Sequence, residues 1–183
     1  MKKFIAAMNM TLDGNCDHSA ILPDDEIHDH YNELLKNADA ILYGRITYQL
    51  MEYWPTVVAN PTGNKATDDF AVTIDNVSKI VFSHTLKNVT WKNSRIAKRS
   101  LQEEVAALKQ QPGRDIFVGS PGLIVQSINL NLLDELQICV HPVISGPGLQ
   151  LFENVNEKLN LRLIKTRHFT GGAVIFYYEP QYN

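Results

Sequence analysis

The sequence predicts an α/β domain in which a mostly parallel sheet is covered by helices on both faces. Strand-like and helix-like segments alternate along most of the 183 residues, a pattern typical of parallel strands joined by crossover helices. Two strand-like segments, 161–169 and 173–178, follow one another across Gly171-Gly172, so we expect an antiparallel edge at the C-terminal end of the sheet. No repeat or linker interrupts the pattern, and we expect residues 1–183 to form a single domain.

Strands are predicted where short apolar runs end at turn residues. Asp13-Gly14 closes the first run and Gly44 closes the second. Trp91 is expected on a short edge strand. The expected strands that precede the C-terminal pair cover residues 4–10, 40–43, 79–82, 115–118 and 136–140.

Helices are predicted where apolar residues recur at helical spacing behind a capping residue. Ser100 and Glu103 have the spacing of a capping box, and Thr47 is expected to cap a short helix that stops before Pro55. The polar segment 60–69 contains proline and glycine and is expected to be a surface loop. The expected helices cover residues 23–36, 47–51, 100–110 and 123–128.

Composition argues against several classes of function. The formal charge is -3 and Lys and Arg form no block, so neither nucleic acid nor a membrane surface is an expected partner. No apolar run approaches the roughly 20 residues needed to span a bilayer. Cys16 and Cys139 are expected to be free thiols in a reducing cytoplasm. The histidines are scattered along the chain, so we expect no metal site.

Two predicted strand-to-helix junctions are candidate phosphate sites, because free N–H groups at a helix start attract anions. The first contains Gly44, which allows close approach of a ligand, Arg45, a permanently charged donor, and Thr47. The second is the turn 119–122, which precedes an apolar helix and matches neither G-x-G-x-x-G nor a P-loop. Both junctions are also consistent with ordinary helix caps or tight turns.

Acidic residues near the first strand are candidates for proton transfer. Asp13 closes that strand, and Asp24 and Asp25 begin the first predicted helix. A carboxyl group in a half-buried cleft can assist protonation of a substrate nitrogen. Asp24 and Asp25 are equally consistent with a structural role, because acidic residues interact favourably with the dipole at a helix N-terminus.

Six segments of the chain carry motifs that occur together in one known superfamily. They are Phe4-Ile5-Ala6-Ala7-Met8, Thr11-Leu12-Asp13-Gly14, Gly44-Arg45-Ile46-Thr47-Tyr48, Ser83-His84-Thr85-Leu86, Val118-Gly119-Ser120-Pro121-Gly122 and His141-Pro142-Val143-Ile144-Ser145-Gly146-Pro147-Gly148. Their order resembles the dihydrofolate reductase-like superfamily. The resemblance is greatest to the reductase domain of the bifunctional bacterial riboflavin-biosynthesis protein and its stand-alone relatives, and it covers nearly the whole chain.

The resemblance implies a dihydrofolate reductase-like three-layer fold with NADPH lying across the ends of the parallel strands. It implies that Ser83 lies near the 2′-phosphate, and that backbone groups of Ala6 and Ala7 hold the nicotinamide carboxamide. The residues implied at the pyrophosphate and adenosine end are Gly44, Arg45 and Thr47. The residues implied to cradle the pyrophosphate are Gly119, Ser120, Pro121, Gly122 and Leu123. The resemblance also implies a homodimer.

Some positions depart from the family's pattern. His84 follows the implied 2′-phosphate serine, where family members often have Arg or Lys, and this bears on the choice between NADPH and NADH. Val118 stands where the riboflavin reductases commonly have an acidic residue, and Asn15 where they often have Arg. Both changes argue against a phosphoribosyl-aminouracil substrate. Segment 22–25 resembles the one that carries the acid of dihydrofolate reductases, with Asp25 at the matching place.

The sequence therefore predicts an NADPH-dependent reductase that transfers hydride to a small heterocycle. That substrate is expected to be pteridine- or pyrimidine-like, and the reaction similar to that of 5-amino-6-(5-phosphoribosylamino)uracil reductase. The catalytic candidates are Asp25 and Asp13. The alternative is a nucleotide-binding module of the same fold without turnover. NADPH titration followed by an assay of NADPH oxidation separates the two.

Overall fold

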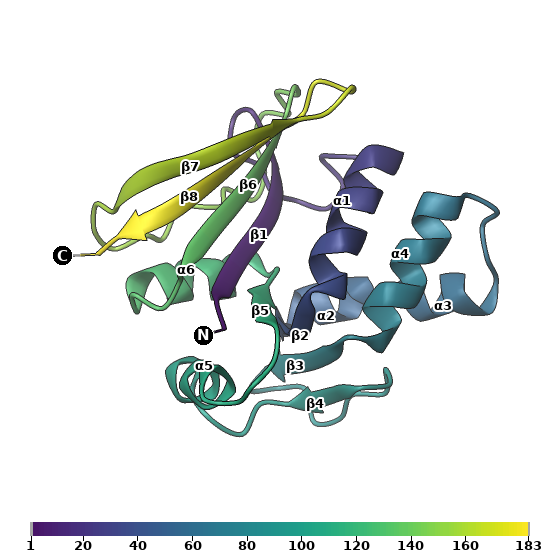
Figure 1. Cartoon of the computed structure of the whole chain (residues 1–183), viewed down its shortest axis with the longest axis horizontal. Helices are drawn as coiled ribbons and strands as arrows, with labels where there is room; N and C mark the ends of the chain where they lie inside the picture. Colours follow the sequence, from purple (N-terminus) through teal and green to yellow (C-terminus); the bar gives the residue numbers. More distant parts are fainter. Residues whose placement is uncertain (1, 183) are drawn as a thin grey trace.

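An eight-stranded sheet forms the middle layer of the molecule (Figure 1). A computed structural model describes residues 2–182 of the chain. Its strands are β1 (Phe4–Thr11), β2 (Ala38–Gly44), β3 (Ser78–Phe82), β4 (Ser94–Ile96), β5 (Asp115–Val118), β6 (Glu135–His141), β7 (Asn160–His168) and β8 (Val174–Gln181). Their order across the sheet is β4-β3-β2-β5-β1-β6-β8-β7. The first six strands are parallel, whereas β8 is antiparallel to β6 and β7 is antiparallel to β8.

Helices cover both faces of this sheet (Figure 1). They are α1 (Asp25–Lys36), α2 (Arg45–Met51), α3 (Trp54–Ala59), α4 (Lys65–Asn76), α5 (Leu101–Lys109) and α6 (Pro121–Asn129). Side chains of α5 and α6 share one apolar core with Phe4 and Ala6 of β1. Side chains of α1, α2 and α4 share a second core with Ile5. Successive residues of a strand face opposite sides, so a parallel strand buried on both faces is a continuous apolar run. The predicted fold class is confirmed.

The predicted loop at 60–69 is wrong over its second half, because α4 begins at Lys65. The Asn64 side chain caps this helix by accepting a hydrogen bond from the Thr67 amide. Phe70 and Ile74 are buried on the inner face of α4, whereas Lys65 is exposed and the other polar residues of its first turns are half-buried. Proline and glycine therefore mark only the loop before the helix.

Two other local predictions are also wrong. Thr47 does not cap a helix, because α2 begins at Arg45 directly after Gly44 and includes Thr47 in its first turn. Trp91 does not lie on the short edge strand, which is β4 at Ser94–Ile96. Trp91 is buried, and its indole N–H donates to Asp75 Oδ1 at 2.7 Å. The aromatic side chain therefore fills the core beside α4.

The capping box and the C-terminal strand pair follow the predictions closely. The Ser100 side chain accepts from the Glu103 amide, and the Glu103 side chain accepts from the Ser100 amide. The turn between β7 and β8 contains Gly172 at φ 86°, a conformation that favours glycine. The predicted turn at 119–122 is shorter than expected, because Pro121 already begins α6, a position at which proline is favoured.

The edge strand β7 is exposed along its whole length. Leu161, Leu163 and Ile164 are 39%, 50% and 45% exposed, which is unusual for neighbouring apolar side chains on an edge strand. No helix within residues 2–182 is long and apolar enough to cross a membrane. Cys16 and Cys139 are free, as predicted, and both are buried.

Candidate functional site

The chain changes sides of the sheet between the neighbouring strands β2 and β5. α2 follows β2 and packs with the core that contains Tyr43, whereas α6 follows β5 and packs on the opposite face with Val118. In open α/β sheets, ligands bind in the crevice outside the carboxyl ends of strands at such a switch point. The ends of β2 and β5 are therefore the candidate site.

One hydrogen bond joins the two turns at this point. The Gly44 amide at the end of β2 donates to Ser120 Oγ, at the start of α6, at 2.9 Å. The structure thus brings together the two junctions that the sequence singled out, although 76 residues separate them. The two turns therefore adjoin at the carboxyl ends of β2 and β5.

The helix starts at this edge are left open, as is the start of α3, in contrast to those of α1, α4 and α5. Side chains of Asp24, Asn64 and Ser100 cap α1, α4 and α5, and each of these helices has acidic residues in its first turn. Neither α2 nor α6 has a side-chain cap or an acidic residue in its first turn. Uncapped N–H groups without a nearby carboxylate favour an anionic ligand.

Glycine leaves room for a ligand at the start of α6. A Cβ built on Gly122 would meet no heavy atom within 4 Å. Pro121 has no amide hydrogen, and the Ile124 amide already bonds the Ser120 carbonyl, so the free amides of this turn belong to Gly122 and Leu123. These groups fit a phosphate that approaches the helix end from the solvent side.

Arg45 and Ser83 lie beside this turn, directly after the ends of β2 and β3. Gly44 pairs with Phe82 across β2 and β3, which places the residues that follow them at the same edge of the sheet. Arg45 is exposed, and its guanidinium donates to Gln49 Oε1 at 3.1 Å. The Ser83 hydroxyl accepts hydrogen bonds from the amides of Thr85 and Leu86.

Ala6 and Ala7 lie where β1 extends past β5. β5 ends at Val118, which pairs with Ala6, whereas β1 continues to Thr11 alongside β6. The side of β1 that faces β5 therefore has no strand partner beyond Ala6 in the described part of the sheet. Its backbone groups there need acceptors and donors from another source, and a carboxamide offers both.

Asp13 holds two loops together. Its carboxylate accepts hydrogen bonds from the Thr11 hydroxyl and from the amides of Ser145 and Gly146. The pKa of Asp13 is lowered, most strongly by the hydrogen bond from Thr11 and next by the hydrogen bond from Gly146. A carboxylate that is stabilised in this way is a weak proton donor at neutral pH.

Asp25 lies apart from Asp13, on the first turn of α1. Its carboxylate accepts a hydrogen bond from Asn64 Nδ2 at 2.9 Å, and the neighbouring Asp24 caps the helix through the Ile27 amide. No hydrogen bond within residues 2–182 joins the two candidate acids. Asp25 is exposed.

The sequence did not reveal how closely the loops after β1 and β6 fit together. A Cβ on Gly148 would lie 2.0 Å from Asn15 Nδ2, so glycine is required where the buried Asn15 side chain crosses the second loop. Asn15 Nδ2 also donates to Ser145 Oγ at 2.9 Å. The glycine-rich end of segment 141–148 was the available signal.

Tyr43 is another feature that the sequence did not indicate. Its side chain is 1% exposed, and its hydroxyl has no hydrogen-bond partner among the described residues. Burial raises the pKa of this hydroxyl, so it stays protonated. Its ring lies 3.6 Å from the position of a Cβ on Gly119, which places it directly behind the turn after β5.

The chain matches known proteins over nearly its full length. The family model of the RibD C-terminal domain matches residues 2–175. The uncharacterized protein YyaP of Bacillus subtilis (strain 168) is 33% identical over 150 residues, which cover 81% of this chain and 78% of YyaP.

Two solved structures illustrate the shared fold. A putative riboflavin biosynthesis protein from Shewanella sp. PV-4 has a TM-score of 0.74 at 18% identity, covering 98% of this chain and 99% of that one. Enterococcus faecalis dihydrofolate reductase, solved with NADP(H) and RAB-propyl, has a TM-score of 0.64 at 14% identity, covering 97% and 96%. The predicted resemblance is confirmed: the chain has a dihydrofolate reductase-like fold and belongs to the RibD C-terminal domain family.

Proposed function

We propose that this protein is an NADPH-dependent reductase that transfers hydride to a small pteridine- or pyrimidine-like heterocycle. The observation that carries the proposal is the pair of uncapped helix starts joined by the Gly44–Ser120 hydrogen bond. The pyrophosphate binds where these two turns meet, with Arg45 beside it and the amides of Gly122 and Leu123 at the start of α6. The same two turns also contain Thr47, Gly119, Ser120 and Pro121.

The protein's own contribution to the reaction is to position the cofactor and the proton donor. The backbone of β1 at Ala6 and Ala7, where the strand loses its β5 partner, orients the carboxamide, and the nicotinamide supplies the hydride when it is bound. Asp25 is the proposed proton donor, because its carboxyl group is exposed and receives a single hydrogen bond, from Asn64. Asp13 has the lesser claim, since its carboxylate is stabilised by three donors.

A homodimer formed through β7 is part of the proposal. The exposed side chains of Leu161, Leu163 and Ile164 lie on an edge strand whose outer backbone is open to pairing. Pairing with a second copy would cover both the backbone and the apolar side chains. The buried free thiols Cys16 and Cys139 support a reducing compartment, and we place the protein in the cytoplasm.

The substitution Gly122→Asp tests the cofactor site. An aspartate there adds a favourable charge to the start of α6, so we expect thermal stability to be maintained or to rise. The same carboxylate repels a phosphate, so the Kd for NADPH is expected to rise by at least about tenfold. Gly122→Asn has the same size without the charge and is the matched control. Equal NADPH affinity in the wild type and the Asp variant would contradict the proposed site.

A binding module without turnover is the second candidate. Val118 favours it, because this buried apolar side chain ends β5 where the riboflavin reductases commonly have an acid. NADPH titration by fluorescence followed by absorbance assays with a panel of pteridines and pyrimidines decides between the two. Binding with no oxidation of NADPH by any substrate supports the module.

A further inference from the structure

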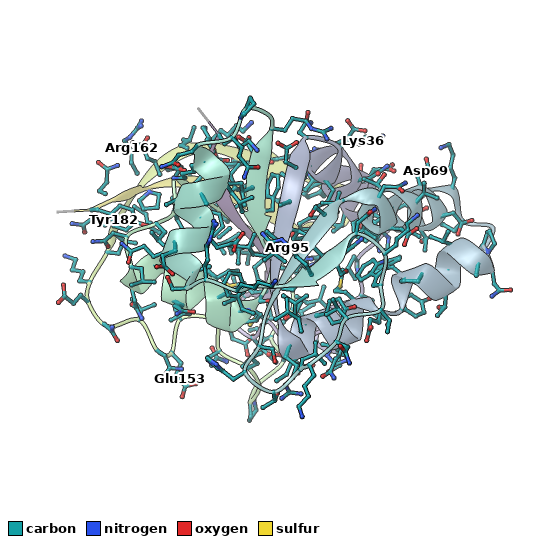
Figure 2. The ribbon with its side chains drawn as sticks, turned by 90° about the horizontal axis from the view of Figure 1, so that it is seen from below. Lys36, Asp69, Arg95, Glu153, Arg162 and Tyr182 are labelled. Carbon is teal, nitrogen blue, oxygen red and sulfur yellow. The ribbon has the colours of Figure 1, made fainter. Side chains whose placement is uncertain are left out.

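A cavity of about 660 Å³ opens at the amino ends of β2, β3 and β4, at the edge of the sheet opposite the cofactor turns. Its walls are the last turns of α1 and α4, the first residues of the three strands, and Arg114 just before β5. Figure 2 shows two of the lining residues, Lys36 of α1 and Arg95 of β4, whereas Arg162 of β7 lies toward the left end of the view. β2 has 7 residues, so its two ends lie about 20 Å apart. The cavity is therefore remote from the cofactor turns.

Arg114 is held at the wall of this cavity by its hydrogen bonds. Its amide donates to Asp39 Oδ2 at 2.8 Å, its Nε to Asp39 Oδ1 at 3.2 Å and its Nη1 to the Lys36 carbonyl at 2.7 Å. Gly113 allows this packing, because a Cβ there would lie 2.0 Å from Asp39 Oδ2. A guanidinium has about five N–H donors, and the two bonds from the Arg114 side chain leave about three of them for another acceptor.

The charge around Arg114 favours an anionic ligand. Asp39, the acidic residue of the lining, is shared by two cations, Arg114 and Lys2, whose Nζ lies 2.6 Å from Asp39 Oδ2. The other cations of the lining, Lys36 and Arg95, each pair with a carboxylate from outside the lining. A positive charge is therefore left over beside the guanidinium that has donors to spare.

The helix ends at this cavity do not favour a cation. The Lys36 carbonyl at the end of α1 accepts from Arg114, and the Asn76 carbonyl at the end of α4 accepts from Asn93 Nδ2 at 3.2 Å. Donors of the chain itself thus satisfy the last carbonyl of each helix.

Ser94 supplies a second polar group that lacks a partner. Its Oγ is shielded from solvent and makes no hydrogen bond within residues 2–182, and the residue lines the cavity. β2 and β3 lie between β4 and β5 in the sheet, so the backbones of Ser94 and Arg114 are three strand spacings apart, or about 14 Å. The arginine side chain spans part of this distance. A ligand between the two residues meets a cation at one end and a hydroxyl at the other.

We propose that this cavity binds a small carboxylate with an apolar body and a hydroxyl at its far end, such as a hydroxyaromatic acid. The carboxylate accepts from the free donors of Arg114, whose planar fork matches its two oxygens. The ligand's hydroxyl pairs with Ser94. Its body packs between them against the apolar side chains of the lining, which are Leu35, Ala38, Val72 and Val77. The volume is in the range of small-molecule sites.

Titration with 4-hydroxybenzoate, followed by amide chemical shifts of the ¹⁵N-labelled protein, tests the site. We expect a Kd of about 1 mM or below, with the largest shifts at the amides of Asp39, Ser78 and Ser94. NADPH should leave these shifts unchanged, because it binds at the opposite edge of the sheet. 4-Hydroxybenzamide has the same shape without the charge, and its Kd should be at least about tenfold higher.

Two substitutions assign the ends of the ligand. Arg114→Gln is expected to raise the Kd for 4-hydroxybenzoate by at least about tenfold. Arg162→Gln is the matched control, because both arginine side chains are 61% exposed and each pairs with one carboxylate. Ser94→Ala should raise the Kd for 4-hydroxybenzoate about fivefold and leave that for benzoate unchanged. The Ser94 hydroxyl has no partner to lose, so this variant provides the test if Arg114→Gln does not fold.

Three outcomes would overturn the inference. The first is the absence of shifts at the amino ends of β2, β3 and β4 with about 10 mM probe. The second is a set of shifts confined to Gly44 and residues 119–122, which would place the probe at the cofactor turns. The third is an equal loss of affinity in Arg114→Gln and Arg162→Gln, which would make the binding a general effect of charge. NADPH titration of the same samples reports on the proposed function separately.

Discussion

The amide of Gly44 and the hydroxyl of Ser120 form a 2.9 Å hydrogen bond that ties the end of β2 to the start of α6. This bond uses the oxygen that would otherwise cap α6, because an N-cap serine normally accepts from its own helix. The start of α6 consequently stays open to an external anion, and the link between the two turns depends on the Ser120 side chain.

Ser120→Ala is expected to lower the free energy of unfolding by about 1 kcal/mol, because the Gly44 amide loses its acceptor. Urea denaturation at pH 7.5 measures the change. Ser127→Ala on the same helix is the control: the Ser127 hydroxyl donates to the Leu123 carbonyl, which keeps its helical partner. A larger loss of unfolding free energy in Ser127→Ala than in Ser120→Ala would contradict the importance of the Gly44–Ser120 hydrogen bond.

Tyr43→Phe is expected to stabilise the protein. The Tyr43 hydroxyl is buried without a partner, and removal of an unsatisfied buried group gains about 1 kcal/mol. Thermal denaturation of the cofactor-free protein should show a higher Tm. A lower Tm would indicate that the hydroxyl is hydrogen-bonded, for example by an internal water molecule.

Tyr48→Phe is the matched comparison for that variant. The Tyr48 hydroxyl accepts a hydrogen bond from the Trp91 amide at 3.1 Å, and both residues are buried. Removal of this acceptor leaves the amide unpaired, so the free energy of unfolding should fall by about 1 to 3 kcal/mol. The two variants are expected to shift Tm in opposite directions.

His30 is expected to make stability depend on pH. Its Nδ1 lies 3.0 Å from Nη1 of Arg167, and because arginine can only donate, this nitrogen accepts. Burial, followed by the charges of Arg167 and Lys165, lowers the pKa of His30 from 6.5 to about 4. In the window between these values the unfolded chain binds a proton that the folded protein excludes.

The stability contributed by neutral His30 is therefore complete above pH 6.5 and is lost as pH falls toward 4. Between pH 7.5 and pH 5.0 the loss attributable to His30 is expected to be about 2 kcal/mol. Urea denaturation at both values, compared with His30→Phe, isolates this part from that of other histidines. An equal pH dependence in the two proteins would refute the assignment.

Hydrophobic periodicity and capping residues predicted the strands and helices whose formation depends on neighbouring residues. The apolar run ending at Gly44 and the Ser100–Glu103 capping box depend on neighbouring residues only, and both appear as expected. The prediction was wrong where a local preference competed with packing. Trp91 has high strand propensity, yet the hydrogen bond to the buried Asp75 and the surrounding core place it off the strand.

For the candidate site, the sequence indicated which segments matter but not how they meet. Gly44 and Ser120 were both singled out, because a glycine turn before a helix is a local signal. Their hydrogen bond was beyond local reasoning, since it depends on β5 returning between β1 and β2. The unpaired hydroxyl of Tyr43 could not be predicted either, because the presence of a hydrogen-bond partner depends on residues that only the fold brings close.

By itself, the order of apolar runs and turn residues determined the α/β class, the antiparallel C-terminal edge and the two glycine turns of interest. Only the tertiary structure decided that those turns adjoin and that β1 extends beyond β5. The physical reason is range: secondary structure depends on residues within a few positions, whereas a crevice forms between segments that chain topology brings together.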